Sequence, residues 1–136
     1  MPNAPITARV RWTEQDRFSG HASSGHEIAM DAGADKVANS PMELVLIALC
    51  GCTASDVAGI LRKKREPFTS LEVLADGERT DTIPKVYSFI RLTYRVGGTV
   101  THKAMEDAVR LSKEKYCSVS AMLEKTAKID VVIEYV

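Results

Sequence analysis

Residues 40–64 constrain the fold most, because they predict one long helix with apolar side chains on every side of its first turns. Ser40 is a suitable N-cap, Pro41 fits the first helical turn, and Glu43 completes a capping box of the form S-x-x-E. Residues 44–49 are apolar throughout, so we expect this part of the helix to be buried on all sides.

A helix that is apolar on all sides is difficult to bury in a chain of 136 residues, which has the length of one domain. A single sheet covers only one side of such a helix, and the simplest cover for the other side is a second subunit. We therefore predict that residues 1–136 form one domain and that this domain is an obligate homodimer, with the long helices near the subunit boundary.

The other segments predict a mixed α+β fold. Residues 7–13 alternate between apolar and polar side chains, which predicts a strand with Ala8, Val10 and Trp12 on one face. The further predicted strands are residues 17–21, 26–30, 70–76, 86–96 and 128–136, and the further predicted helices are residues 101–115 and a short one from about residue 117. Because the strands come in runs, we expect mainly antiparallel sheet.

Charge and the N-terminal sequence narrow the classes of partner and location. Eighteen basic and eighteen acidic residues cancel, whereas proteins that bind nucleic acids usually carry a basic excess. The first residues lack the basic start and the apolar stretch of a signal peptide. The longest uncharged apolar run, residues 44–55, is shorter than the ~20 residues that span a bilayer. We expect a cytoplasmic protein without a nucleic-acid or membrane partner.

The three cysteines point to thiol chemistry. In a reducing compartment stable disulfides are rare, and pairs of thiols are usually catalytic, sensory or metal-binding. Cys52 and Cys117 both lie in helix-like segments and predict a two-thiol redox site, in which one sulfur attacks an oxidant and the other closes a disulfide. Cys50 is turned by about 200° from Cys52 on the helix, so one of the two faces a pocket and the other packs. The alternative is that all three are inert core residues. Because no histidine stands at ligand spacing from a cysteine, no metal is predicted.

The surroundings of the two sulfurs are expected to differ. Cys117 lies just ahead of a short helix, whose backbone N–H groups and dipole stabilise a thiolate and predict a lowered pKa for Cys117. Cys52 lies within an apolar helix, so it needs a cation or a hydrogen-bond donor nearby in order to react.

Two motifs taken together match a known family. The motif Ser40-Pro-Met-Glu-Leu44 stands eight residues before Cys52, and the motif Cys117-Ser-Val-Ser follows in the C-terminal part. With them the chain resembles the OsmC/Ohr family of bacterial thiol peroxidases over nearly its whole length. Residues 24–31 and 114–119 look most similar to the YhfA-like branch of that family.

The resemblance implies an OsmC-like fold, in which an intertwined homodimer wraps its sheets around buried central helices and holds two sites at the subunit interface. It also implies that Cys52 attacks a hydroperoxide and forms a sulfenic acid. Cys117 would condense with that acid to a disulfide, and a dithiol reductant, for example of the lipoyl type, would reopen it. The apolar helix wall favours organic hydroperoxides over hydrogen peroxide, because an alkyl chain gains from burial. No metal, haem, flavin or other cofactor is implied.

The chain departs from the family pattern next to the motif proline. Family members carry a Glu there, paired with an N-terminal Arg that steadies the thiolate, whereas this chain has Met42. Glu43 is out of phase with Cys52 and serves as a cap, and Arg17 is the most plausible replacement cation, with Arg9 and Arg11 behind it. The departure keeps a second hypothesis open, a weakly active redox-sensing or apolar-ligand-binding module on the same dimeric scaffold. In a third, both cysteines are structural.

Overall fold

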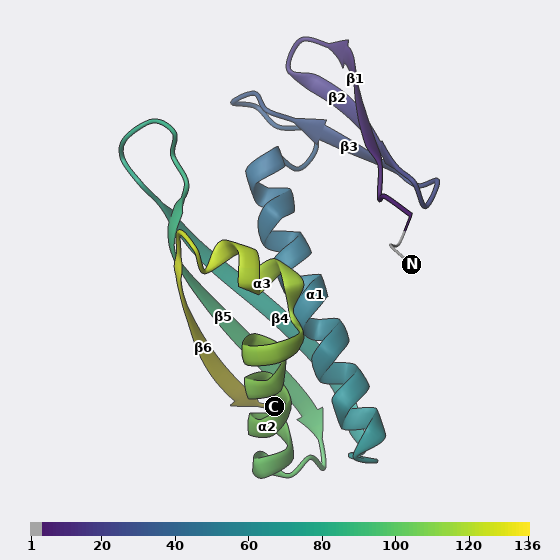
Figure 1. Ribbon diagram of the computed structural model, residues 1–136, viewed down its shortest axis with the longest axis vertical. Helices are drawn as coiled ribbons and strands as arrows, with labels where there is room; N and C mark the ends of the chain where they lie inside the picture. Colours follow the sequence, from purple (N-terminus) through teal and green to yellow (C-terminus); the bar gives the residue numbers. More distant parts are fainter. Residues whose placement is uncertain (1–3) are drawn as a thin grey trace. The chain divides into compact units, whose positions relative to one another are not determined.

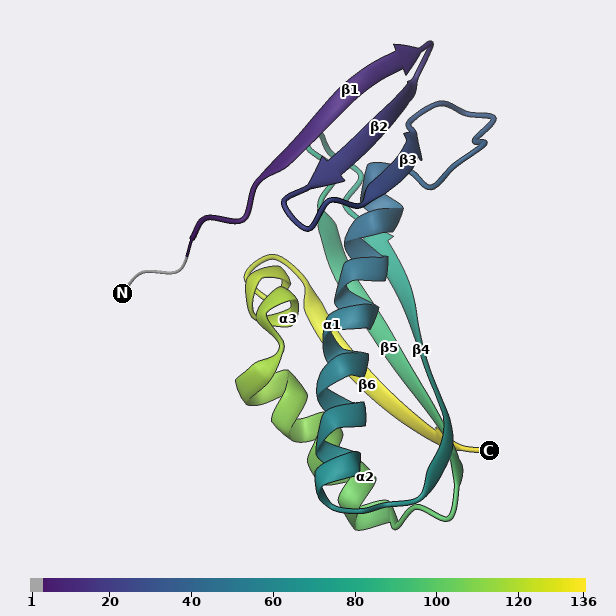
Figure 2. The same ribbon diagram turned by 90° about the vertical axis from the view of Figure 1, so that its right-hand side faces the viewer.

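The computed structural model describes residues 4–136, and it confirms the predicted α+β class (Figures 1 and 2). The elements in chain order are β1 Ala8–Glu14, β2 Arg17–Ala22, β3 Glu27–Asp31, α1 Pro41–Lys63, β4 Phe68–Arg79, β5 Tyr87–Gly98, α2 His102–Leu111, η1 Ser112–Tyr116, α3 Ser118–Leu123 and β6 Lys128–Tyr135. The chain divides into two compact units, one up to Val45 and the other Leu46–Val136, and α1 runs across the boundary. One folding domain over residues 1–136 stays a prediction.

The second unit contains a three-stranded sheet in the order β4-β5-β6. β4 pairs with β5 in the antiparallel direction, whereas β5 pairs with β6 in the parallel direction. A parallel pair needs a long crossover, and here α2, η1 and α3 provide it. The other sheet, β1-β2-β3, is antiparallel throughout, so the prediction of mainly antiparallel pairing is confirmed.

The core of the second unit lies between this sheet and the helices α1 and α2, which cover the same face of it (Figure 2). Side chains of β5 alternate across the sheet, so that Ile90, Leu92, Tyr94 and Val96 are all buried on the helix-covered side. The buried residues of α1 recur at intervals of four, which places them in one stripe: Leu49, Thr53, Val57 and Leu61.

Within the single chain, α1 is buried along that stripe only, which differs from the expectation of burial on all sides. Of residues 44–49 only Leu49 is fully buried, and Ile47 is 52% exposed. The physical reason is that one sheet and one neighbouring helix cover a single side of α1. The complete helix is 23 residues and is long and apolar enough to cross a membrane, a test that core helices of soluble proteins also pass.

The strand β1 forms as predicted, but its apolar face is exposed within the chain. All seven of its residues are exposed, including Val10 at 57% and Trp12 at 64%. Because large apolar side chains are rarely exposed in clusters, this face and the open side of α1 are the surfaces that the homodimer hypothesis must account for.

The predicted capping box at the start of α1 is confirmed. The backbone N–H of Ser40 donates to Glu43 Oε1 at 2.8 Å, and the backbone N–H of Glu43 donates to Ser40 Oγ at 3.2 Å. These bonds hold the pKa of Glu43 below its ordinary value, because the carboxylate accepts from the backbone of Ser40. Glu43 therefore belongs to the helix start, as the sequence indicated.

Asp31 organises the loop between β3 and α1 in the first unit. Its buried carboxylate accepts backbone hydrogen bonds from Gly33 at 2.8 Å and Val37 at 3.1 Å, and it lies 3.7 Å from Arg17. The hydrogen bond from Gly33, followed by that from Val37 and the charges of Arg17 and Lys36, lowers the pKa of Asp31. The ionised carboxylate is thus the form that the fold stabilises.

We expect Asp31→Asn to destabilise the first unit near neutral pH and to lose this effect in acid. Because the pKa is lower in the folded state, the stabilisation is present above the unfolded value of ~3.9 and disappears as pH falls through the folded pKa. Urea unfolding followed by the fluorescence of Trp12, the only tryptophan, measures it at about pH 7 and about pH 3. Asp35→Asn in the same loop is the control, and an Asp31→Asn deficit unchanged in acid would contradict the assignment.

Candidate active site

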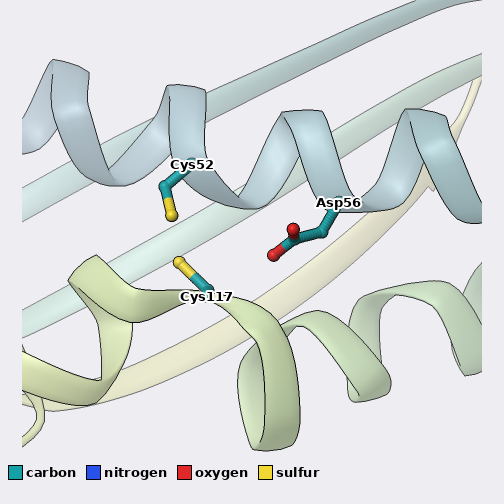
Figure 3. Close-up of side chains that lie close together, drawn as sticks. All are labelled: Cys52, Asp56 and Cys117. Carbon is teal, nitrogen blue, oxygen red and sulfur yellow. The ribbon is translucent and has the colours of Figure 1, made fainter. Parts of the chain in front are cut away.

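Two sulfurs and one carboxylate converge between α1 and the start of α3 (Figure 3). Cys52 and Asp56 stand four residues apart on α1, which places both side chains on one face of the helix. Cys117 faces them from the N-cap position of α3. The two sulfur atoms and a carboxylate oxygen of Asp56 all lie within 4.8 Å of one another. The structure therefore brings together Cys52 and Cys117, as the sequence predicted, and adds a carboxylate.

A π-helical turn positions Cys117. The helix predicted for residues 101–115 ends as an α-helix at Leu111 and continues as the π-helix η1, whose last turn is closed by a 2.8 Å hydrogen bond from Cys117 N–H to the Ser112 carbonyl. Such turns are rare and are frequently found at functional sites. The turn ends with Cys117 in an extended conformation, and its sulfur points toward α1 (Figure 3).

The predicted lowering of the Cys117 pKa is wrong. The side chain is 3% exposed, and this burial raises the pKa of Cys117 to about 11, although the Ser120 N–H donates to the sulfur at 3.4 Å and acts in the opposite direction. The Cys52 thiol and the Asp56 carboxylate raise the pKa further. The effect of desolvation on the pKa is larger than that of the helix, because the six-residue helix α3 donates only one N–H to the buried sulfur.

The other two cysteines differ in what they face. Both are partly buried, but Cys52 faces Cys117 (Figure 3), whereas Cys50 is two residues away on α1 and is not among the three groups of the site. Burial raises the pKa of the Cys50 thiol. Cys50 is thus the sulfur that packs, and Cys52 the sulfur that faces the site.

A line of buried hydroxyl groups leads from the core to the carboxylate. The Tyr94 hydroxyl lies 2.7 Å from Thr53 Oγ1, which lies 2.7 Å from Ser112 Oγ, and Ser112 donates to Asp56 Oδ2 at 2.9 Å. Because Ser112 gives its single proton to Asp56, it must accept from Thr53, which in turn accepts from Tyr94. Burial raises the pKa of Tyr94 to about 12, so this phenol keeps the proton that it donates.

Two buried serines allow a matched test of this network. We expect Ser112→Ala to lower the free energy of unfolding by about 1–3 kcal/mol, because the buried Thr53 hydroxyl loses its acceptor and Asp56 loses its donor. Ser120 Oγ is equally buried but has no hydrogen-bond partner within residues 4–136, so Ser120→Ala should be neutral or slightly stabilising. Urea unfolding of both variants measures the difference, and equal losses would contradict the network.

Comparison with known proteins identifies the family. Residues 33–132 match the family described as OsmC-like protein. Protein YhfA of Escherichia coli K12 is 44% identical over 125 residues, which cover 91% of this chain and 93% of that protein. The chain belongs to the OsmC-like family.

Solved structures share this OsmC-like fold. A hypothetical protein from Aquifex aeolicus VF5 has a TM-score of 0.89 at 32% identity, with 98% of both chains covered. An organic hydroperoxide resistance protein from Elizabethkingia anophelis has a TM-score of 0.78 at 14% identity, with 99% of both chains covered. The predicted OsmC-like fold of the chain and the predicted likeness to the YhfA-like branch are therefore confirmed, whereas the intertwined homodimer stays a prediction.

Arg17, the predicted replacement cation, is engaged within the first unit. Its guanidinium lies 3.7 Å from Asp31 and 3.5 Å from Glu14. Arg9 and Arg11 are exposed on β1. The role of Arg17 toward the sulfurs stays a prediction for this OsmC-like chain, and so do the catalytic roles of Cys52 and Cys117.

Sequence reasoning missed Asp56, Ser112, Thr53 and Tyr94. The spacing Cys52-x-x-x-Asp56 on a helix was a usable signal, because residues four apart share a face. No comparable signal marks Ser112, which lies on η1, or Tyr94, which lies on β5, because tertiary packing brings both of them to the site.

Proposed function

We propose that this OsmC-like chain is a cofactor-free thiol peroxidase that reduces hydroperoxides, with Cys52 as the attacking thiol and Cys117 as the resolving thiol. The observation that carries the proposal is the pair of sulfurs within 4.8 Å of each other. Both are free thiols, and a short shift would bring them to the ~2.05 Å of a disulfide bond.

The burial of the two thiols supports this division of roles. Cys52 is partly exposed, so a peroxide can reach its sulfur, whereas Cys117 is 3% exposed. Burial also raises the pKa of Cys117, which disfavours its thiolate as the first nucleophile and leaves that role to Cys52. Arg17 is the proposed cation for the Cys52 thiolate. Arg17→Lys keeps the positive charge and Arg17→Ala removes it, so comparing the two variants separates the effect of the charge from that of the contact with Asp31.

The two cysteines, the hydroperoxide and the dithiol reductant account for every bond made or broken in the proposed reaction. The Cys52 thiolate attacks the outer oxygen of the hydroperoxide, the O–O bond breaks, and the alkoxide leaves and is protonated to an alcohol. The Cys52 sulfenic acid then accepts the Cys117 sulfur, forming a disulfide and releasing water. A dithiol reductant, for example of the lipoyl type, reduces this disulfide by exchange and is itself oxidised to a disulfide.

The family supports a general redox or hydroperoxide-related role. The Elizabethkingia neighbour is described as an organic hydroperoxide resistance protein, and at 14% identity it shares the fold. A cavity of about 460 Å³ borders Asp56 and carries the apolar residues Ile60, Leu111 and Tyr116. Apolar walls favour a substrate with an alkyl chain, because its burial is favourable, so organic hydroperoxides are the proposed class.

A cytoplasmic homodimer is the proposed assembly. The exposed apolar residues Val10 and Trp12 on β1, together with Ile47 on α1, support a second subunit as their cover. Sedimentation should give twice the chain mass at micromolar concentration, and Trp12→Asp should shift the protein toward the monomer. A well-folded monomer at that concentration would rule out the obligate dimer.

Thiol counting during oxidation tests the proposed function. Reduced protein is mixed with cumene hydroperoxide, and free thiols are counted and the oxidised peptides mapped. We expect rapid loss of two of the three thiols and a peptide pair joining Cys52 to Cys117. A folded protein that keeps all three thiols for hours would instead support the redox-sensing or ligand-binding module.

A further inference from the structure

The Asp56 carboxylate beside the two sulfurs completes a set of three metal-binding donors. Cys52, Asp56 and Cys117 each offer one ligand atom, and these atoms lie within 4.8 Å of one another (Figure 3). Two thiolates and one carboxylate are a donor set that Zn²⁺ accepts, and three protein ligands leave a fourth, open position. We propose that the reduced site binds one thiophilic divalent cation, such as Zn²⁺, through these three residues.

The spacing of the donors fits a tetrahedral ion. Zinc–sulfur bonds of about 2.3 Å and zinc–oxygen bonds of about 2.0 Å hold neighbouring ligand atoms about 3.5–3.8 Å apart. The three ligand atoms are at most 4.8 Å apart, so movements of about 1 Å would bring them to the separations of a tetrahedral site.

The local charges favour a cation at this position. Asp56 takes part in no ion pair within the described residues 4–136, although it lies beside two groups that can become anions. A carboxylate next to two sulfurs repels thiolates, whereas a shared divalent ion would attract all three groups. Binding replaces the two thiol protons by two metal–sulfur bonds and releases both protons to solvent.

The Asp56 carboxylate also has the hydrogen-bond partner that metal-binding carboxylates usually have behind them. Ser112 donates to Asp56 Oδ2, and Thr53 and Tyr94 continue the hydrogen-bonded line behind it. This line fixes the carboxylate, as outer partners of metal ligands do. The cavity of about 460 Å³ borders Asp56, one of the three donors. If the proposed peroxidase function holds, a bound ion would cover both sulfurs and block their reaction with hydroperoxide.

Metal titration of the fully reduced protein without oxygen tests the inference. Cd²⁺ is added first, because its bonds to thiolates absorb in the ultraviolet, and Zn²⁺ is then measured by competition with a chromogenic chelator. We expect one ion per chain. Cys52→Ser and Cys117→Ser should each abolish the absorption, and Asp56→Asn should weaken binding about 10–100-fold. Ser112→Ala should weaken it about 10-fold, while Cys50→Ser should leave it unchanged.

Three results would overturn the inference: no saturable binding, unchanged affinity in Asp56→Asn, or absorption that persists in Cys52→Ser. The binding assay contains no peroxide, and peroxide reduction is measured separately with chelator present. A protein that binds metal without reducing peroxide would therefore refute the proposed function alone. One that reduces peroxide without binding metal would refute this inference alone. Thermal unfolding of each variant confirms that it is folded.

Discussion

Cys52→Ser is expected to lower the rate of reaction with organic hydroperoxides by at least about 10³-fold, because a serine hydroxyl is not ionised at neutral pH and is a poor nucleophile. Cys52 is the thiol that is both partly exposed and directed at Cys117, so no other sulfur of the chain can take its place. Stopped-flow consumption of cumene hydroperoxide, measured in a single turnover, gives the rate.

Cys50→Ser is the matched control, because it removes a partly buried thiol two residues away on the same helix, turned by about 200° from Cys52. It should retain the rate of the unchanged protein within about twofold. If Cys50→Ser loses activity and Cys52→Ser keeps it, the two assignments must be exchanged. If both variants react like the unchanged protein, the thiol mechanism is wrong.

Cys117→Ser is expected to separate the two chemical steps. The first attack should persist, since Cys52 remains, but the sulfenic acid has no partner to condense with and multiple turnover with a dithiol reductant should fall by about 10²-fold. Trapping with dimedone and mass spectrometry should detect the sulfenic acid on Cys52 in this variant, at a level well above that in the unchanged protein.

The trapping experiment can also reject the division of roles. Dimedone addition to Cys117 in the Cys52→Ser variant, at the normal rate, would show that the buried thiol attacks first. Undiminished turnover of Cys117→Ser would show that the reductant acts on the sulfenic acid directly, without the 52–117 disulfide. The burial of Cys117, at 3% exposure with a raised pKa, is the reason to expect neither result.

Local sequence rules sufficed wherever neighbours along the chain decide the structure. The reciprocal bonds of Ser40 and Glu43 form as the S-x-x-E spacing predicts, because a capping box lies within one helical turn. The alternation along β5 follows in the same way from the strand period.

The same rules failed where distant segments meet. The charge at the start of α3 predicted a lowered Cys117 pKa, but burial of the sulfur by the packed helices prevails. The helix was predicted to run through Lys115, but the α-helix ends at Leu111. No residue pattern predicts the π-helical turn that follows.

The sequence by itself determined the α+β class and the bounds of the long helix, and it predicted that the sulfurs of Cys52 and Cys117 lie close together. Only the tertiary structure decided that Asp56 stands beside both sulfurs and that Ser112, Thr53 and Tyr94 support it. These residues come from α1, β5 and η1, and their distances depend on how the helices pack on the sheet. A linear pattern contains periods and spacings, whereas packing distances arise only when the elements bury their apolar faces together.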